Sequence, residues 1–177
     1  MRLLSECYPR SIESRLMRKL GLPPVVDENT EILILGSLPG DESLAAGQYY
    51  ANRKNDFWKL VGDALNENLH ELTYNDKLKS LKIHRIGLWD AYYACFRRGS
   101  MDKDIAEEEP NDFAVLKSVA PNIGLICFNG GEAAGMKDSL VSLGYQTCLL
   151  PSSSPANRGY RGGRLSHWRA AIRNGAS

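Results

Sequence analysis

The sequence predicts a three-layer α/β domain in which helices cover both faces of a central, mostly parallel sheet of about four strands. Short apolar runs bounded by turn-forming residues recur along the chain, and such runs are typical of strands buried on both faces. Segments with apolar residues at helical spacing separate these runs, and this alternation predicts βαβ units. A length of 177 residues suits one domain, so we expect a single domain over 1–177.

The N-terminal half is expected to hold two helices and two strands. Residues 11–20 have the pattern of a short basic amphipathic helix, which Gly21 would end. Residues 31–36 form an apolar run bounded by turn formers, which predicts a buried strand. Residues 56–66 place apolar side chains at helical spacing, and residues 85–89 are the second predicted strand.

The C-terminal half continues the alternation of helix and strand. A helix is expected to begin at Asn111, whose side chain suits the N-cap position. The clearest strand covers 123–128, and a helix over 131–143 connects it to a fourth strand at 146–150. A last helix is predicted to begin near Gly163. Because ligands of such sheets bind at the carboxyl ends of the strands, the loops after the first and fourth strands are the first places to search.

Composition and charge exclude several classes of protein. The 22 Lys+Arg residues nearly balance 21 Asp+Glu residues, so the protein is not uniformly basic in the way that a histone is. The longest apolar runs, such as 32–35, are far shorter than the ~20 residues of a membrane span, so no membrane association is expected. The N-terminus lacks the apolar core of a secretory signal, which favours a cytoplasmic location.

Metal chemistry is not expected either. The four cysteines form no C-x-x-C pair, and they are Cys7, Cys95, Cys127 and Cys148. Zinc and iron–sulfur sites usually contain at least one such close pair. We therefore expect reduced thiols, no metal and no cofactor.

The loop after the first strand is long, and its composition suits a functional site. Between Ser37 and Asn55 it concentrates side-chain amides, aromatic rings and cations. Because it has neither G-x-x-x-x-G-K-[ST] nor G-x-G-x-x-G, it is a poor match for a phosphate-cradling loop. The alternative is a well-anchored polar surface loop.

The loop after the fourth strand is rich in serine and continues into a basic segment. From Pro151 to the C-terminus the chain has five arginines and no acidic residue, whereas residues 102–112 hold six acids. Serine hydroxyls and arginines together suit a phosphodiester backbone. The alternative is a solvated helix face.

Six short motifs occur together along the chain, and together they carry a family resemblance. They are Gly36-Ser-Leu-Pro-Gly40, Gln48-Tyr-Tyr-Ala51, Asn55-x-Phe57-Trp58, Gly87-Leu-Trp-Asp90, Phe128-Asn-Gly130 and Pro151-Ser-Ser-Ser-Pro-Ala-Asn157. With these motifs the chain resembles the hypoxanthine-DNA glycosylase branch of the uracil-DNA glycosylase superfamily over about 22–172. Each motif is weak alone, and the combination in this order is specific.

The resemblance implies hydrolysis of the N-glycosidic bond between a deaminated base and deoxyribose, after the nucleotide has been flipped out of the DNA stack. Many superfamily members position the attacking water with Asp or Asn directly after the first strand, where this chain has Ser37. The resemblance moves that role to Asn55, which also suits the N-cap of the following helix. Many relatives have His-Pro before this Asn and this chain does not, so Asn52 remains a second candidate.

The resemblance also implies residues that contact the base and the DNA backbone. The candidates for base binding, with Phe57 as the stacking ring, are Phe57, Asp90, Tyr50 and Asn129. The candidates for contact with the DNA backbone are Ser152, Ser154, Asn157, Arg158 and Arg161. Arg158 is also a candidate to fill the space that the flipped base leaves in the stack. Structural roles stay open beside these: Phe57 in the core, Asn129 in a turn, and Asp90 as a helix cap or ion-pair partner.

The resulting hypothesis is a metal-free DNA repair glycosylase that acts as a monomer on deoxyinosine in double- or single-stranded DNA and leaves an abasic site. One alternative is uracil excision from mismatched or single-stranded DNA. A second is a non-catalytic DNA-binding module of the same fold. Binding to DNA should weaken steeply as salt is added.

Overall fold

The computed structural model of the chain describes residues 17–157 and 163–175. The central sheet has the strand order β3-β2-β6-β7, and neighbouring strands pair in parallel. Its strands are β2 (Ile32–Gly36), β3 (Ile86–Asp90), β6 (Leu125–Asn129) and β7 (Gln146–Leu150). The predicted fold class is therefore confirmed.

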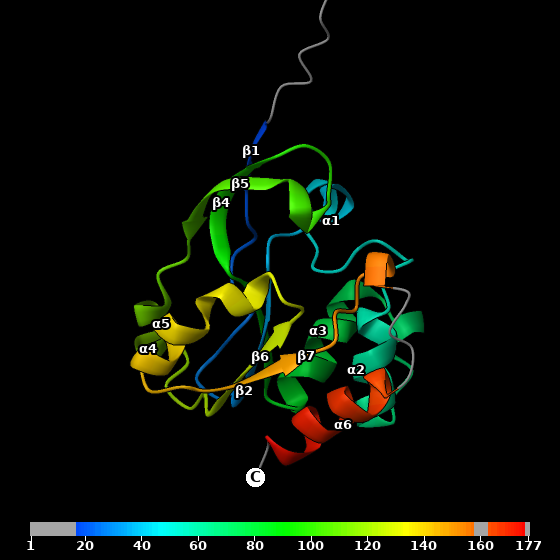
Figure 1. Cartoon of the computed structure of the whole chain (residues 1–177). Helices are drawn as coiled ribbons and strands as arrows, with labels where there is room; N and C mark the ends of the chain where they lie inside the picture. Colours follow the sequence, from blue (N-terminus) through cyan, green and yellow to red (C-terminus); the bar gives the residue numbers. More distant parts are fainter. Residues whose placement is uncertain (1–16, 158–162, 176–177) are drawn as a thin grey trace, which may run out of the picture.

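Helices cover both faces of this sheet (Figure 1). One layer consists of α2 (Phe57–Leu65), α3 (Tyr74–Ile83) and α6 (Arg164–Asn174), and the other of α4 (Leu116–Val119) and α5 (Lys137–Ser142). A further helix, α1 (Asp41–Ala46), follows β2. Short 3-10 turns lie between these elements, namely η1 (Leu69–Glu71), η2 (Asp102–Asp104), η3 (Phe113–Val115), η4 (Ala133–Met136) and η5 (Pro155–Asn157).

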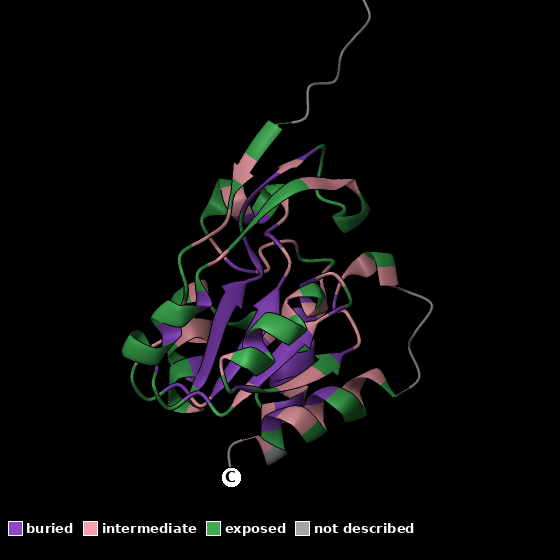
Figure 2. Cartoon of the chain, turned by 60° about the vertical axis from the view of Figure 1, so that its left-hand side comes forward, coloured by how far each residue is buried: buried purple, intermediate pink, exposed green. Residues whose placement is uncertain are grey.

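Strand β2 explains how one apolar run supports two cores. Successive side chains of a strand point to opposite faces of the sheet. Ile32 and Ile34 accordingly pack with the layer of α2, α3 and α6, whereas Leu33 and Leu35 pack with the layer of α4 and α5. All five residues of β2 are buried, and Figure 2 shows the central sheet as the most deeply buried part of the fold.

A second, antiparallel sheet was absent from the sequence-based prediction. It has the order β1-β4-β5 and consists of β1 (Met17–Leu20), β4 (Tyr92–Arg97) and β5 (Ile105–Pro110). The predicted helix at 11–20 is wrong for 17–20, because these residues pair with β4, and 11–16 lie outside the described residues. This small sheet lies above the carboxyl ends of the parallel strands (Figure 1).

The helix expected at Asn111 also needs correction. Asp112 is the capping residue, since its Oδ1 accepts a hydrogen bond from Ala114 N at 3.0 Å. Asn111 instead donates from Nδ2 to the Asp90 carbonyl oxygen at 2.9 Å. The segment predicted as a helix at 131–143 divides into η4 and α5.

Two further observations concern membrane-spanning helices and cysteines. In the part of the chain that the structure describes, no helix combines the length and apolar character needed to cross a membrane. Cys95 and Cys127 are buried free thiols and Cys148 is a half-buried one, and Cys7 lies outside the described residues.

Candidate active site

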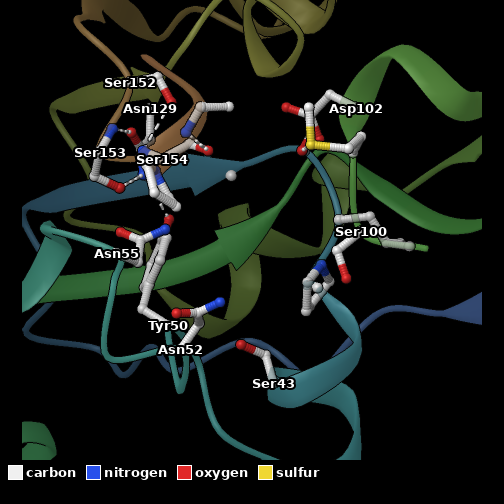
Figure 3. A pocket seen from close by; sticks show the side chains of 18 of the residues that line it. Ser43, Tyr50, Asn52, Asn55, Ser100, Asp102, Asn129, Ser152, Ser153 and Ser154 are labelled. Atoms are coloured by element: carbon white, nitrogen blue, oxygen red, sulfur yellow. Dashed lines mark hydrogen bonds between the residues drawn. The ribbon is translucent and has the colours of Figure 1, made fainter. Parts of the chain in front are cut away.

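A cavity of about 720 Å³ lies where the parallel strands β2, β3 and β6 end. This is the position at which parallel α/β sheets bind ligands. Two walls face each other across the cavity (Figure 3). One carries Tyr50, Asn55, Asn129 and Ser152–Ser154, and the other carries Ser100 and Asp102. The lining residues come from 36–43, 49–55, 100–103 and 152–157, together with Asp90 and Asn129.

Asn129, at the end of β6, connects the two predicted loops. Its Oδ1 accepts from Ser153 N at 2.8 Å, and its Nδ2 donates to Ser153 Oγ at 2.9 Å and to Tyr50 Oη at 3.1 Å. A backbone hydrogen bond from Asp56 N to Ser153 O, 3.1 Å long, joins the same two segments. The loops after β2 and β7 therefore form one bonded wall, and the Tyr50 hydroxyl keeps its own proton for a ligand.

Tyr50 and Phe57 form a stacked pair with ring centroids 3.7 Å apart and planes 7° apart. Phe57 is completely buried, in edge-to-face contact with Trp58 and Trp168, and does not line the cavity. Tyr50 lies between Phe57 and the cavity. Tyr50 is thus placed to offer its free face to a planar ligand, with Phe57 as the support behind it.

The backbone at Tyr50 is in the left-handed region, with φ at 53°. A tyrosine seldom adopts this conformation, which costs on the order of 1 kcal/mol or more and persists where the surrounding structure imposes it. The stacking on Phe57 and the hydrogen bond from Asn129 supply that constraint here.

The two candidate catalytic amides differ in which hydrogen-bonding atoms remain available to a ligand or a water. Asn52 uses both ends of its amide, since Nδ2 donates to Glu42 Oε1 at 2.9 Å and Oδ1 accepts from Lys54 N at 2.8 Å. Asn55 accepts from Phe57 N at 3.0 Å through Oδ1, which gives it the predicted capping role at the start of α2. Its Nδ2 has no hydrogen-bond partner among residues 17–157 and 163–175 and is available to a ligand or a water.

Asp90 ends β3 at the inner surface of the cavity and is only 3% exposed. Its Oδ2 is buried without a partner among the described residues. Burial raises the pKa of the Asp90 carboxyl well above its usual range, and hydrogen bonds from Tyr49 and the Leu22 amide offset only part of this effect. A protonated Asp90 offers a ligand one donor and one acceptor.

Ser37 also lines the cavity, and its hydroxyl donates to Asp102 Oδ1 at 2.6 Å. Asp102 belongs to η2, in the connection between β4 and β5. The small sheet thus brings a carboxylate to a position directly after β2, from a residue 65 positions away in the chain.

The serine-rich loop forms one rim of the cavity. Ser152 Oγ accepts from Ser154 N at 3.2 Å, and Asn157 Nδ2 donates to the Ser152 carbonyl oxygen at 3.3 Å. Ser154 and Asn157 line the cavity beside Ser152. The predicted contacts of Arg158 and Arg161 fall outside the described residues. Of the remaining arginines in this segment, Arg164 pairs with Asp56.

Helix α6 turns its other arginines toward α2. Arg169 donates to the Asp63 carbonyl oxygen and Arg173 to the Ala64 carbonyl oxygen. These guanidinium groups therefore link α6 to α2. From the charge pattern of the sequence alone, the same arginines could equally have faced DNA.

Two site residues have contacts that the sequence-based prediction did not assign to them. Ser153 stood within a predicted motif, and only its bonds to Asn129 reveal its function as the connecting residue. Asp102 stood in an acidic stretch far from any predicted motif, and no local signal connects it with Ser37. Among the described residues no group of three or more His, Cys, Asp and Glu side chains is arranged to hold a metal ion.

Comparison with known proteins gives matches over nearly the whole chain. Residues 23–174 match the family model of the uracil DNA glycosylase superfamily. A hypoxanthine DNA glycosylase of Methanosarcina acetivorans is 54% identical over 158 residues, which are 89% of this chain and 100% of that protein. A hypoxanthine DNA glycosylase of Methanosarcina barkeri is 48% identical over 157 residues, which are 89% of this chain and 99% of that protein.

More distant and structural matches agree. A G/U mismatch-specific uracil DNA glycosylase of Schizosaccharomyces pombe is 32% identical over 118 residues, which are 63% of this chain and 35% of that protein. A solution NMR structure of a Methanosarcina acetivorans protein superposes with a TM-score of 0.83 at 53% identity, over 91% of this chain and 100% of that one.

Proposed function

The chain belongs to the uracil-DNA glycosylase superfamily and is a DNA repair glycosylase, and from this premise we propose that its substrate is deoxyinosine in DNA, from which it releases hypoxanthine. Two relatives that are 54% and 48% identical carry the name hypoxanthine DNA glycosylase, which supports this base over uracil. We propose further that the protein acts as a monomer, in the cytoplasm, on the DNA of the nucleoid.

The observation that carries the proposal is the pairing of an aromatic face with a buried carboxyl in one cavity. A flipped base would stack on Tyr50, and its edge would meet the Asp90 carboxyl. Hypoxanthine presents an N1–H donor beside an O6 acceptor, and a protonated carboxyl offers the complementary acceptor and donor.

Cleavage of the glycosidic bond builds positive charge on the sugar and negative charge on the departing base. Donors that meet the base therefore stabilise the transition state more than the ground state. Asp90 is assigned this role. The Nδ2 group of Asn55 is assigned to hold the attacking water by donating a hydrogen bond to its oxygen.

The backbone of the DNA is assigned to the rim of the cavity. Ser152, Ser154 and Asn157 lie together there. The hydroxyls of Ser152 and Ser154 accept from Ser154 N and Ala156 N and keep their own protons for phosphate oxygens. Each contact replaces a hydrated phosphate and its counterions, so the affinity should fall as salt rises. Arg158 and Arg161 follow directly in the sequence and are assigned to the same backbone.

The test is a panel of DNA duplexes and single strands that contain deoxyinosine, deoxyuridine or deoxyxanthosine, scored for alkali-labile sites under single-turnover conditions. We expect the fastest release from deoxyinosine. Faster release from deoxyuridine would make the protein a uracil glycosylase. Tight binding without release of any base would leave a DNA-binding module.

Asn55 requires two variants, because its side chain both caps α2 and faces the cavity. Asn55→Ala removes both roles and should cost about 0.5–2 kcal/mol of stability through the lost cap. Asn55→Asp keeps the acceptor that caps Phe57 N and loses the amide donor. If water is held by Nδ2, Asn55→Asp should excise slowly while it melts close to the wild type.

A further inference from the structure

The reaction assigned to this cavity needs a group that accepts a proton from water, and the amides do not supply it. The Oδ1 of Asn55 accepts from Phe57 N, and the Oδ1 of Asn52 accepts from Lys54 N. What remains of Asn55 is a donor. An amide, moreover, has no basicity to hold a proton that water releases.

Four carboxylates line the cavity, and three of them are occupied or neutral. Asp41 pairs with Lys19, and Glu42 accepts from Asn52 at 2.9 Å. Asp90 is buried and holds its own proton more tightly than an exposed carboxyl does. The fourth carboxylate is Asp102.

Asp102 is exposed at the wall opposite Asn55 and Asn129 (Figure 3). Its Oδ1 accepts from Ser37 Oγ, and its Oδ2 has neither a hydrogen bond nor an ion pair with any described residue.

The segment that carries Asp102 is fastened at three points. Lys19 Nζ donates to the Gly99 carbonyl oxygen at 2.6 Å, and Asp41 N donates to Ser100 Oγ at 2.8 Å. Ser37 Oγ is the third point. The carboxylate is therefore held at the cavity by the end of β2 and by α1, and its position does not depend on the β4–β5 connection alone.

From this geometry we infer that Asp102, oriented by Ser37, is the catalytic carboxylate of the reaction, and the inference rests on the proposed function. The water oxygen forms a bond to C1′ while the bond from C1′ to N9 of hypoxanthine breaks, and the bonding electron pair leaves with the base. One proton of the water that Asn55 holds passes across the cavity to Asp102 through a second water, Asp102 returns it to solvent, and the departing base takes up a proton from solvent. The negative charge of Asp102 also stabilises the positive charge that develops on the sugar.

The first test is Asp102→Asn, with Asp104→Asn as the matched control. Asp104 belongs to the same turn and does not line the cavity. General-base catalysis contributes roughly 100- to 10,000-fold, so single-turnover excision by Asp102→Asn should fall at least 100-fold. Affinity for the lesion duplex should be unchanged or higher, since a negative charge has been removed. Asp104→Asn should excise within threefold of the wild type.

Chemical rescue separates a catalytic role from a structural one. Added formate should accelerate Asp102→Ala at least tenfold, because a small carboxylate can enter the vacated space, and should leave Asn55→Ala unchanged. Excision by Asp102→Asn within threefold of the wild type would overturn the inference. So would a slow Asp102→Ala that formate leaves slow. A different result would overturn the proposed function itself: the wild type would then release no base from any substrate. That failure is seen without any variant of Asp102, so it is distinguishable from failure of the inference.

Discussion

Truncation of Tyr50 gives a direct measure of base stacking in this cavity. Its ring is supported from behind by Phe57 at 3.7 Å and leaves one face for a ligand, so Tyr50→Ala removes the face on which a base would lie. Stacking of a base on an aromatic side chain contributes about 1–3 kcal/mol, which corresponds to about 5- to 160-fold in rate at subsaturating DNA. Tyr50→Phe keeps the ring and should retain this part of the activity.

The assay is single-turnover excision from a deoxyinosine duplex at enzyme concentrations below saturation, with thermal melting of each variant. Tyr93→Ala is the matched control, since Tyr93 is 51% exposed on β4 and does not line the cavity. Phe57→Ala should behave differently. It removes a fully buried ring and should cost about 3–5 kcal/mol of stability, a large share of the total for a domain of this size.

Two results would refute this reasoning. The first is a Tyr50→Ala variant that excises within twofold of the wild type. The second is a Phe57→Leu variant that melts normally yet loses more activity than Tyr50→Ala. That outcome would return the stacking role to Phe57, as the family resemblance implied.

Three further variants test the site and its support. Asp90→Asn should be more stable than the wild type at pH 7 and lose this advantage toward pH 4. The pKa of Asp90 is higher in the folded protein than in the unfolded chain, so the unfolded chain releases this proton at lower pH. The wild type therefore loses stability as the pH rises from about 4 through the folded pKa. Paired thermal melts of the two proteins across this range measure the effect. Gly130→Ala should destabilise the fold by about 1–2 kcal/mol in urea unfolding, since φ is +99° there and a new Cβ would lie 3.0 Å from Ser152 Cβ. An unchanged midpoint would contradict this. Asn129→Ala breaks three hydrogen bonds to Ser153 and Tyr50, and we expect weaker DNA binding by anisotropy together with slower excision, whereas an unchanged affinity would show that the serine loop holds its shape alone.

The parallel sheet could be predicted because its strands carry their signal locally. Residues 31–36 and 146–150 are apolar runs between turn formers. The observed β7 has the predicted bounds, and β2 begins one residue later than predicted. The small antiparallel sheet lacks such a signal. β1 is stabilised by pairing with β4, as in Met17 opposite Arg97. The partner residue is 80 positions away, so the local pattern that predicted a helix at 11–20 contains no information about this pairing.

The site shows the same division between local and distant information. Tyr50, Asn55 and the serine loop follow strands of the parallel sheet, and Asn129 ends one. The rule that ligands bind at strand ends brings them together. Which ring faces the cavity is a different question. Tyr50 and Phe57 stand in the same stretch of sequence, and only the packing of Phe57 between Trp58 and Trp168 decides it.

The two walls of the cavity carry opposite chemistry, and this orients the substrate. Hydroxyl and amide donors gather at Ser152, Ser154 and Asn157, so DNA phosphates are expected on that side. The negative charge of Asp102, which would repel phosphates, lies across the cavity. There it would stabilise the positive charge that develops on the sugar. The net charge of +1 for the whole chain does not reveal that donors and the carboxylate lie on opposite walls. For catalysis, this local arrangement of charge matters more than the net charge. If the separation matters, Asp102→Asn should bind an intact duplex at least as tightly as the wild type does and still excise slowly.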